Sequence, residues 1–273
     1  MKPLIAVLTD YGLKDHYVGL LKAVIKNVCP DAEVVDITHY IPKYNIALAA
    51  HVLKISRKYF PKNTVFLAVV DPGVGSSRRN LIIKSSNYVY VGPDNGLLIQ
   101  ASEDDGHYEA YEIILSKVAL PKVSKTFHGR DIYAPAAALI ACGVSVESLG
   151  VSIPKDSLVR VRSCVTTPRE VFKDVFEVDV LHVDDFGNVV TSVTREVFEK
   201  TMSITLGDEV FVSGDMSSWF KAYYVETFSQ VRRGELAIYE GSYEVMEVAV
   251  YEGSAKDILN IKDKIYLKRL KGV

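Results

Sequence analysis

The stretch TVFLAVVDPGVGSSRR, residues 64–79, places a polar loop directly after a strand pattern. Residues 64–70 are almost entirely apolar, which is typical of a strand that a sheet buries on both faces. Asp71, Pro72 and the glycines at 73 and 75 then end the strand, and the two glycines permit close backbone approach to a ligand. The neighbouring segments indicate what kind of sheet this strand joins.

Strand and helix patterns alternate before this strand. Apolar runs at 3–8 and 33–37 predict two further strands, and apolar residues at helical spacing predict helices over 15–28 and 44–59. This β-α-β-α-β order predicts an α/β domain with a mostly parallel sheet and helices on both faces. A further helix is predicted over 131–142, with Pro135 in its first turn.

The second half of the chain has a different pattern. From Val175 onward, short segments of alternating apolar and polar residues are separated by Gly, Asp or Ser turns. This pattern predicts a smaller all-β domain, an antiparallel sandwich or barrel. With a linker near 163–170, the predicted domains are residues 1–165 and 170–273.

The overall charge favours no polyanionic partner. The chain has 32 basic and 34 acidic residues, a net charge of -2. Neither nucleic acid nor an anionic membrane is therefore an expected partner. No apolar run reaches the roughly 18 residues of a membrane span, and the N-terminus lacks a signal-peptide pattern, which predicts a cytoplasmic protein.

Three cysteines, Cys29, Cys142 and Cys164, are widely spaced and form no CxxC motif. This spacing argues against a disulfide framework or a zinc site. Each cysteine is predicted to be a small buried hydrophobic residue.

Carboxylates follow three of the predicted strands. Asp10 comes after strand 3–8, Asp71 after 64–70, and Asp94 after a strand predicted at 87–91. A single polar residue at such a position is often only a turn former or a helix cap. Ligands of open α/β sheets bind beyond the carboxyl ends of the strands. Together the three carboxylates therefore suggest a pocket for hydroxyl groups or a cation.

The loop 71–79 does not match a phosphate-binding motif. It lacks both the GK[ST] of a Walker A loop and the GxGxxG pattern, and Asp71 would repel a phosphate. Arg78 can fold back to pair with Asp71 or to orient a polar ligand. Arg79 is interpreted as a solvated neighbour.

His128 lies beside Arg130 and Asp131 at the start of the helix predicted over 131–142. A lone histidine is more often structural, and Asp131 is a plausible N-cap. Near a carboxylate and an arginine, however, His128 is also a candidate to orient or deprotonate water.

The stretch HVDDFGNVVTS, residues 182–192, is a candidate ligand site in the β half. Its glycine and asparagine also fit an ordinary hairpin turn. As a site, it would use Asp184 for ribose hydroxyls, Phe186 for stacking, and Asn188 for a base edge or a methionine-like group. No metal-ligand spacing occurs in the sequence, and no metal is predicted.

Five motifs occur together in the order TDYGLKDHYVG (9–19), VVDPGVGSSRR (69–79), VGPDNGLL (91–98), FHGRDIYAPAAA (127–138) and VDDFGNVVTS (183–192). In combination they resemble the S-adenosyl-L-methionine hydroxide adenosyltransferases, a family related to fluorinating and chlorinating enzymes. The resemblance covers residues 4 to about 268. It implies a Rossmann-like N-terminal domain, a β-barrel C-terminal domain, and a homotrimer with active sites between subunits.

The resemblance also implies a reaction. Water or hydroxide attacks the 5′ carbon of S-adenosylmethionine (SAM) and releases adenosine and methionine, with no cofactor beyond the substrate. The family's catalytic constellation maps onto Asp71, Arg78 and His128, and its ribose-binding aspartate onto Asp10. The adenosine contacts of the second domain map onto Asp184, Phe186 and Asn188.

The sequence departs from the family pattern in the second domain. Ser192 stands where asparagine is frequent, and YEGSYEVMEV (239–248) has fewer Asn and Ser residues than the usual adenine-contact segment. By resemblance, the substrate contacts in this segment map onto Ser242, Tyr243 and Glu247.

Two other functions stay open from the sequence. One is a non-catalytic protein that senses adenosine or SAM, although a sensor would not need Asp71, Arg78 and His128 together. The other is a SAM-dependent halogenase, which Asp71 disfavours because a fixed negative charge would repel a halide.

Overall fold

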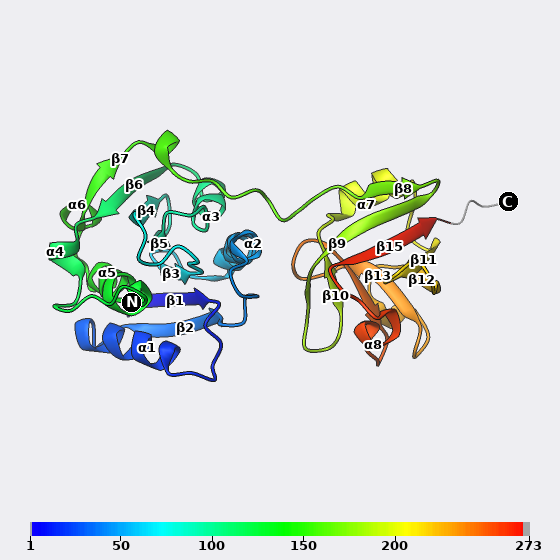
Figure 1. Ribbon diagram of the computed structural model, residues 1–273, viewed down its shortest axis with the longest axis horizontal. Helices are drawn as coiled ribbons and strands as arrows, with labels where there is room; N and C mark the ends of the chain where they lie inside the picture. Colours follow the sequence, from blue (N-terminus) through cyan, green and yellow to red (C-terminus); the bar gives the residue numbers. More distant parts are fainter. Residues whose placement is uncertain (1, 270–273) are drawn as a thin grey trace. The chain divides into compact units, whose positions relative to one another are not determined.

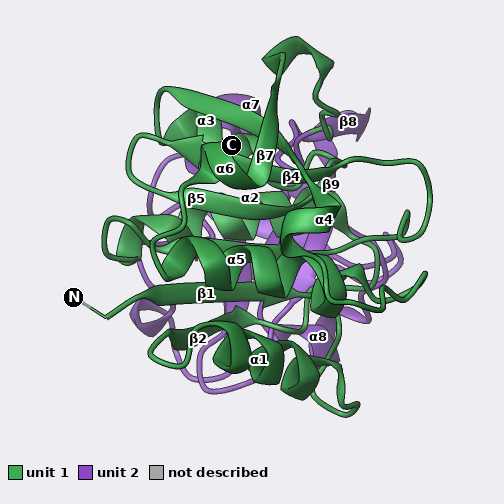
Figure 2. Cartoon of the chain, turned by 90° about the vertical axis from the view of Figure 1, so that its left-hand side faces the viewer, with its two compact units in different colours: residues 1–162 green, residues 163–273 purple. Residues whose placement is uncertain are grey.

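The computed structural model describes residues 2–269 and has two compact units, which comprise residues 1–162 and 163–273 of the chain (Figures 1 and 2). Each unit encloses its own hydrophobic core. Within the described residues, every helix is too short or too polar to cross a lipid bilayer.

The first unit contains a seven-stranded sheet in the order β2-β1-β3-β5-β4-β6-β7. The first four strands of this order pair in parallel, and the remaining pairs are antiparallel. The strands are β1 (Leu4–Thr9), β2 (Glu33–Thr38), β3 (Val65–Val69), β4 (Asn80–Ser85), β5 (Val89–Pro93), β6 (Tyr108–Ile113) and β7 (Gly150–Ile153).

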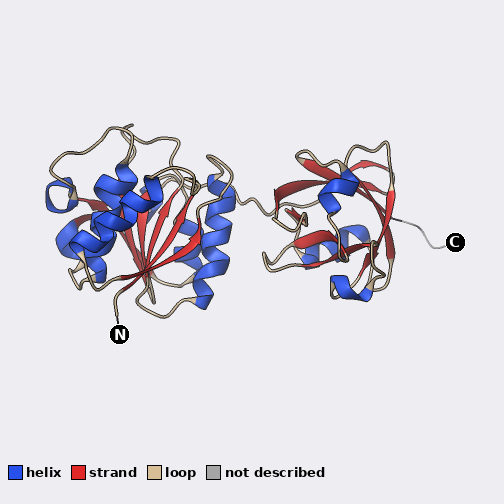
Figure 3. Cartoon of the chain, turned by 90° about the horizontal axis from the view of Figure 1, so that it is seen from below, coloured by secondary structure: helices blue, strands red, loops and turns tan. Residues whose placement is uncertain are grey.

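Helices cover both faces of this sheet (Figure 3). α1 packs against α5, and α2 packs against α3. The helical elements are α1 (Tyr17–Val28), α2 (Ile46–Ser56), η1 (Arg57–Tyr59), α3 (Ile99–Asp104), α4 (Leu115–Val118), η2 (Gly129–Tyr133), α5 (Ala134–Ala141), α6 (Val146–Leu149) and η3 (Lys155–Ser157). The predicted α/β architecture with a mostly parallel sheet is confirmed.

A disulfide joins Cys29 and Cys142, at the C-terminal ends of α1 and α5. The prediction that each cysteine is only a buried hydrophobic residue is therefore wrong for this pair. The two helices lie side by side in the fold, although the cysteines are 113 residues apart in sequence. Cys164 is a free, half-buried thiol, and burial raises its pKa to about 11.

The second unit is a β-barrel, which confirms the predicted all-β domain. Seven strands follow the order β10-β14-β13-β12-β11-β15-β9, and pairing of β9 with β10 closes the barrel. Among the strands of residues 2–269, β8 (Arg169–Phe172) pairs with β9 alone. The barrel strands are β9 (Val175–Val183), β10 (Val189–Thr191), β11 (Glu209–Ser213), β12 (Phe220–Tyr224), β13 (Leu236–Glu240), β14 (Met246–Val250) and β15 (Lys264–Arg269).

Alternating side chains of these strands fill the barrel interior, as the period of two requires. Three short helical elements lie among the connections, namely α7 (Arg195–Met202), η4 (Phe228–Gln230) and α8 (Ala255–Leu259). Thr194 and Ser254 cap α7 and α8 with their side-chain hydroxyls.

Candidate active site

The carboxyl ends of β1 and β3 lie next to each other, because the two strands pair in parallel and Thr9 lies opposite Val69. Asp10 and Asp71, which follow these residues closely, therefore reach the same pocket. The pocket has a volume of about 250 Å³ and is lined by Asp10, Tyr11, Asp15, Tyr17, Lys43, Tyr44, Val69, Asp71, Val74, Thr126, His128 and Gly129.

Asp71, Arg78 and His128 form one connected cluster at this pocket. The Nε of Arg78 donates to Oδ1 of Asp71 over 2.8 Å, and Nη2 donates to Oδ2 of the same carboxylate. The same Nη2 lies 3.0 Å from Nδ1 of His128. The Asp71 and Arg78 side chains are 5% and 9% exposed. A two-pronged contact of this kind fixes the direction of the carboxylate.

The contact with Arg78 determines which hydrogen-bonding groups His128 offers to the pocket. A guanidinium can only donate, so Nδ1 of His128 must accept. The neutral ring then carries its hydrogen on Nε2. Burial, followed by the positive charge of Arg78, lowers the pKa of His128 below its ordinary value of 6.5. His128 is therefore a neutral imidazole at pH 7 with an Nε2–H donor.

Two residues outside the predicted set hold Arg78. Its Nη1 donates to Oδ1 of Asn80 over 2.7 Å, and the Tyr133 hydroxyl donates to the same oxygen over 2.8 Å. The guanidinium also lies over the Tyr133 ring, 5.6 Å from the ring centroid. Sequence reasoning missed this support, because Tyr133 is 53 residues from Asn80 and no spacing in the sequence indicates that the two side chains meet.

Asp10 is almost completely buried and is held by the segment before α2. The backbone N–H of Tyr44 donates to its Oδ2 over 3.0 Å, and Lys43 donates to its carbonyl oxygen. The end of β1 is held by a further hydrogen bond, in which Oγ1 of Thr9 lies 2.8 Å from Nδ1 of the buried His39. These contacts hold Asp10 in place at the pocket.

Tyr11 is one of the pocket residues that the sequence analysis did not single out. Its ring packs edge-to-face against Tyr17 and Phe127, with centroids 6.0 and 5.8 Å away. Its hydroxyl lies against Gly129, where any Cβ would overlap it. Burial, together with the negative charges of Asp10 and Asp71, holds the pKa of this phenol well above its ordinary value, so Tyr11 stays protonated.

Three expectations about neighbouring residues are wrong. Asp94 does not line this pocket; it pairs with Arg79 and accepts from the backbone N–H of Val159. Arg79 is accordingly a structural partner and not a solvated neighbour. Asp131 is not an N-cap, because it lies inside η2, where its carboxylate accepts from Arg130 and from the backbone of Ser124.

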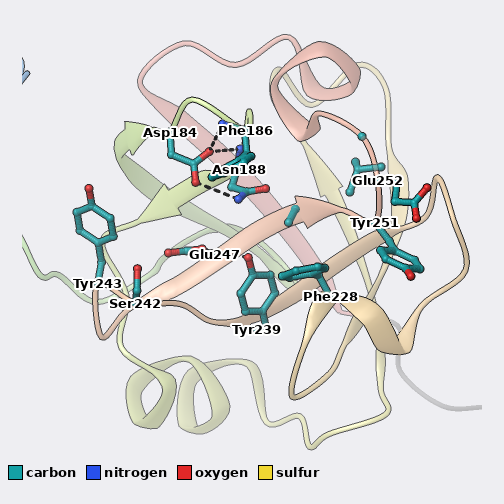
Figure 4. A pocket seen from close by; sticks show the side chains of 13 residues that line it. Asp184, Phe186, Asn188, Phe228, Tyr239, Ser242, Tyr243, Glu247, Tyr251 and Glu252 are labelled. Atoms are coloured by element: carbon teal, nitrogen blue, oxygen red, sulfur yellow. Dashed lines mark hydrogen bonds between the residues drawn. The ribbon is translucent and has the colours of Figure 1, made fainter.

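The barrel unit carries a second and larger pocket, of about 640 Å³ (Figure 4). All six residues predicted for the second domain line it. Figure 4 shows an aromatic end with Phe228 and Tyr251 and a polar end with Ser242 and Tyr243. The lining comprises Asp184, Phe186, Asn188, Phe228, Tyr239, Ser242, Tyr243, Glu247, Ala249, Val250, Tyr251, Glu252 and Gly253.

The loop before β10 is organised by Asp184. Its Oδ1 accepts from the backbone N–H groups of Phe186 and Asn188, and its Oδ2 accepts from the Asn188 side chain. The turn interpretation of this stretch therefore holds for its backbone. The same turn leaves the Phe186 ring 79% exposed at the pocket.

Glu247 lies on β14 and is only 6% exposed. Its Oε2 accepts from the Tyr239 hydroxyl over 3.1 Å. Burial, followed by the negative charge of Asp184, raises the pKa of the Glu247 carboxyl. A positively charged ligand group would counteract this shift.

One known family matches both units. A family model described as the SAM hydroxide adenosyltransferase N-terminal domain matches residues 5–150, and the C-terminal domain of the same family matches residues 178–265. The chain belongs to the SAM hydroxide adenosyltransferase family. The predicted resemblance is therefore confirmed across both units.

Individual relatives of this chain carry two kinds of name. An "(R)-S-adenosyl-L-methionine hydrolase" of Thermus thermophilus is 36% identical and covers 99% of this chain and 100% of its own length. A "Fluorinase" of Nocardia brasiliensis is 28% identical over 73% of this chain and 74% of its own. A solved structure of an uncharacterised conserved protein from Thermotoga maritima is 39% identical, with a TM-score of 0.83 over 97% of this chain and 100% of its own.

Proposed function

We propose that this protein hydrolyses S-adenosyl-L-methionine to adenosine and L-methionine. The observation that carries the proposal is the Asp71 carboxylate, which Arg78 holds beside His128 at the carboxyl end of β3. The hydrolase name of full-length relatives at 36% and 30% identity supports it.

The adenosine part of one substrate molecule contacts residues of both pockets, the adenine in the barrel pocket and the ribose in the pocket of the first unit. In the barrel pocket, Phe228 has Tyr239 and Tyr251 as ring neighbours and can stack on an adenine. In the pocket of the first unit, Asp10 can accept from both ribose hydroxyls with its two oxygens. The Asn188 amide and the Ser242 hydroxyl offer hydrogen bonds to the rest of the ligand.

The reaction is a displacement at the 5′ carbon. The oxygen of a bound water forms a bond to C5′, and the C5′–S bond breaks with its electron pair left on sulfur. The sulfonium becomes the neutral thioether of methionine, which is a good leaving group. Catalysis therefore consists of placing one water in line with the breaking bond.

The geometry of the cluster gives its members separate roles. Nδ1 of His128 faces Arg78, so the ring has only its Nε2–H for the water and cannot receive a proton there. The acceptor for the water is the Asp71 carboxylate, whose direction Arg78 fixes. His128 thus orients the nucleophile, and Asp71 accepts its hydrogen as the oxygen attacks carbon.

The proposed reaction requires neither a metal nor a cofactor. The positive sulfur already activates the bond that breaks, so no Lewis acid is needed to draw electrons away from C5′. Substrate binding and a held water are sufficient.

A halogenase is the second candidate function, because some relatives carry the name fluorinase. Asp71 argues against it. A halide in this pocket would meet a fixed carboxylate, which repels an anion but accepts hydrogen bonds from water. A non-catalytic sensor is also disfavoured, because binding alone does not require the Asp71–Arg78–His128 cluster.

The assembly in this proposal is a homotrimer. In the family arrangement that the motifs suggest, the N-terminal unit of one subunit and the barrel of the next share each active site. In such a site, the pocket of the first unit and the barrel pocket would contact the same substrate molecule.

Product analysis tests the proposed function. Purified protein is incubated with SAM, with and without chloride or fluoride, and the products are separated. Adenosine and methionine in equal amounts are expected under all conditions, and the variant Asp71→Ala should bind SAM but lose most turnover. A 5′-haloadenosine would instead support a halogenase, and binding without turnover would support a sensor.

A further inference from the structure

Glu247 is closely packed by its neighbours in the barrel pocket. Its carboxylate lies directly against Gly241, where any side chain would overlap the carboxylate group. The Tyr239 hydroxyl holds one of its oxygens. Glycine at position 241 therefore leaves room for a buried carboxyl group that lines a ligand pocket.

The other carboxylates of this pocket already have partners. Asp184 accepts three hydrogen bonds within its own loop, and Glu252 pairs with Arg233 over 2.8 Å. Glu247 has no Lys, Arg or His partner among residues 2–269. No lysine or arginine lines the pocket in this described part of the chain. An uncompensated buried carboxylate favours a cationic ligand group in contact with it.

The pocket of the first unit is acidic as well. Asp10, Asp15 and Asp71 line it, and its one lysine, Lys43, donates to the carbonyl oxygen of Asp10. Arg78 is neutralised by Asp71. In both pockets the charge that is left for a ligand is negative.

SAM carries two positive groups, the sulfonium and the α-ammonium, and one negative carboxylate. The barrel pocket offers carboxylates to the positive groups, but among residues 2–269 it has no lysine or arginine to pair with the negative one. We propose that Glu247 binds the ammonium group of SAM and that no cationic side chain binds the SAM carboxylate. The protein therefore also hydrolyses the decarboxylated analogue of SAM, an adenosyl sulfonium with an aminopropyl chain. This inference rests on the proposed hydrolysis of SAM.

The second reaction follows the same course as the first. The oxygen of water bonds to C5′, the C5′–S bond breaks with its electron pair on sulfur, and one proton leaves to solvent. The products are adenosine and 3-(methylthio)propylamine. No oxidant, reductant or further reactant is required.

The test compares kcat/KM for SAM and for the decarboxylated analogue with the same enzyme preparation. We expect the analogue to match or exceed SAM, or to fall within about tenfold of it. A kcat/KM for the analogue that is lower by more than this factor, with SAM hydrolysed normally, would overturn the inference and leave the proposed function intact. Failure to hydrolyse either compound would instead refute the proposed function.

The variant Glu247→Gln tests the role of the ammonium contact. It should lose about tenfold or more in kcat/KM for both substrates, because a desolvated charge pair is lost. Its affinity for adenosine, which has no ammonium, should not change. The matched control is Glu240→Gln, which removes an exposed carboxylate from β13 outside the pocket. An equal loss of adenosine affinity, or unchanged kcat/KM in Glu247→Gln, would contradict the assignment.

Discussion

His128 illustrates how one contact decides a chemical role. From sequence alone it can orient or deprotonate water, and both interpretations are reasonable. The 3.0 Å contact between its Nδ1 and Nη2 of Arg78 removes the second one, because the only ring nitrogen free to face water carries a hydrogen. Asp71 is then the acceptor in the pocket.

The pH dependence of kcat/KM follows from the lowered pKa of His128. Burial and Arg78 keep the ring neutral at pH 6.5, and protonation at lower pH would place a cation against the guanidinium. We expect kcat/KM to be flat around pH 7 and to decline only below pH 6.5. The variant His128→Asn, measured over the same range, should lack this acid limb. An acid limb centred above pH 6.5 in the native enzyme would contradict the assignment.

The Cys29–Cys142 disulfide links two secondary-structure elements, α1 and α5. It closes a long loop of the chain, and such a cross-link stabilises by about 2–4 kcal/mol, chiefly through the unfolded state. The double variant Cys29→Ser, Cys142→Ser should therefore unfold at a clearly lower temperature than the native protein without reductant. Equal midpoints in thermal unfolding would show that the cross-link contributes nothing; Cys164→Ser is the control.

The elements differ in how far the sequence predicts them. The buried strands β1 and β3 have continuous apolar patterns, and the polar residues that follow them are enough to predict that Asp10 and Asp71 share one edge of the sheet. The disulfide has no such local signal, because its cysteines meet only through the packing of two helices.

The site is predicted to a similar extent. Candidate residues at the ends of strands and in distinctive loops can be named from sequence, and they include six of the thirteen residues that line the barrel pocket. What supports them is missed, as Asn80 and Tyr133 behind Arg78 show. Such partners come from different elements and follow no spacing rule.

At the scale of the whole molecule, the proposed trimer makes a distinct prediction. Asp71→Ala and Asn188→Ala should each be nearly inactive, because one damages the first unit and the other the barrel. Mixed trimers, obtained by co-expression, should recover about a quarter of the native activity if each site takes its two halves from different subunits. No recovery in mixed trimers would mean that each site lies within one subunit.

The origin of the oxygen in the product tests the central claim most directly. The enzyme is incubated with SAM in water enriched in oxygen-18, and both products are analysed by mass spectrometry. Attack of water on C5′ predicts one labelled oxygen in the 5′-hydroxyl of adenosine and none in methionine. Unlabelled adenosine, or label in methionine, would contradict the account.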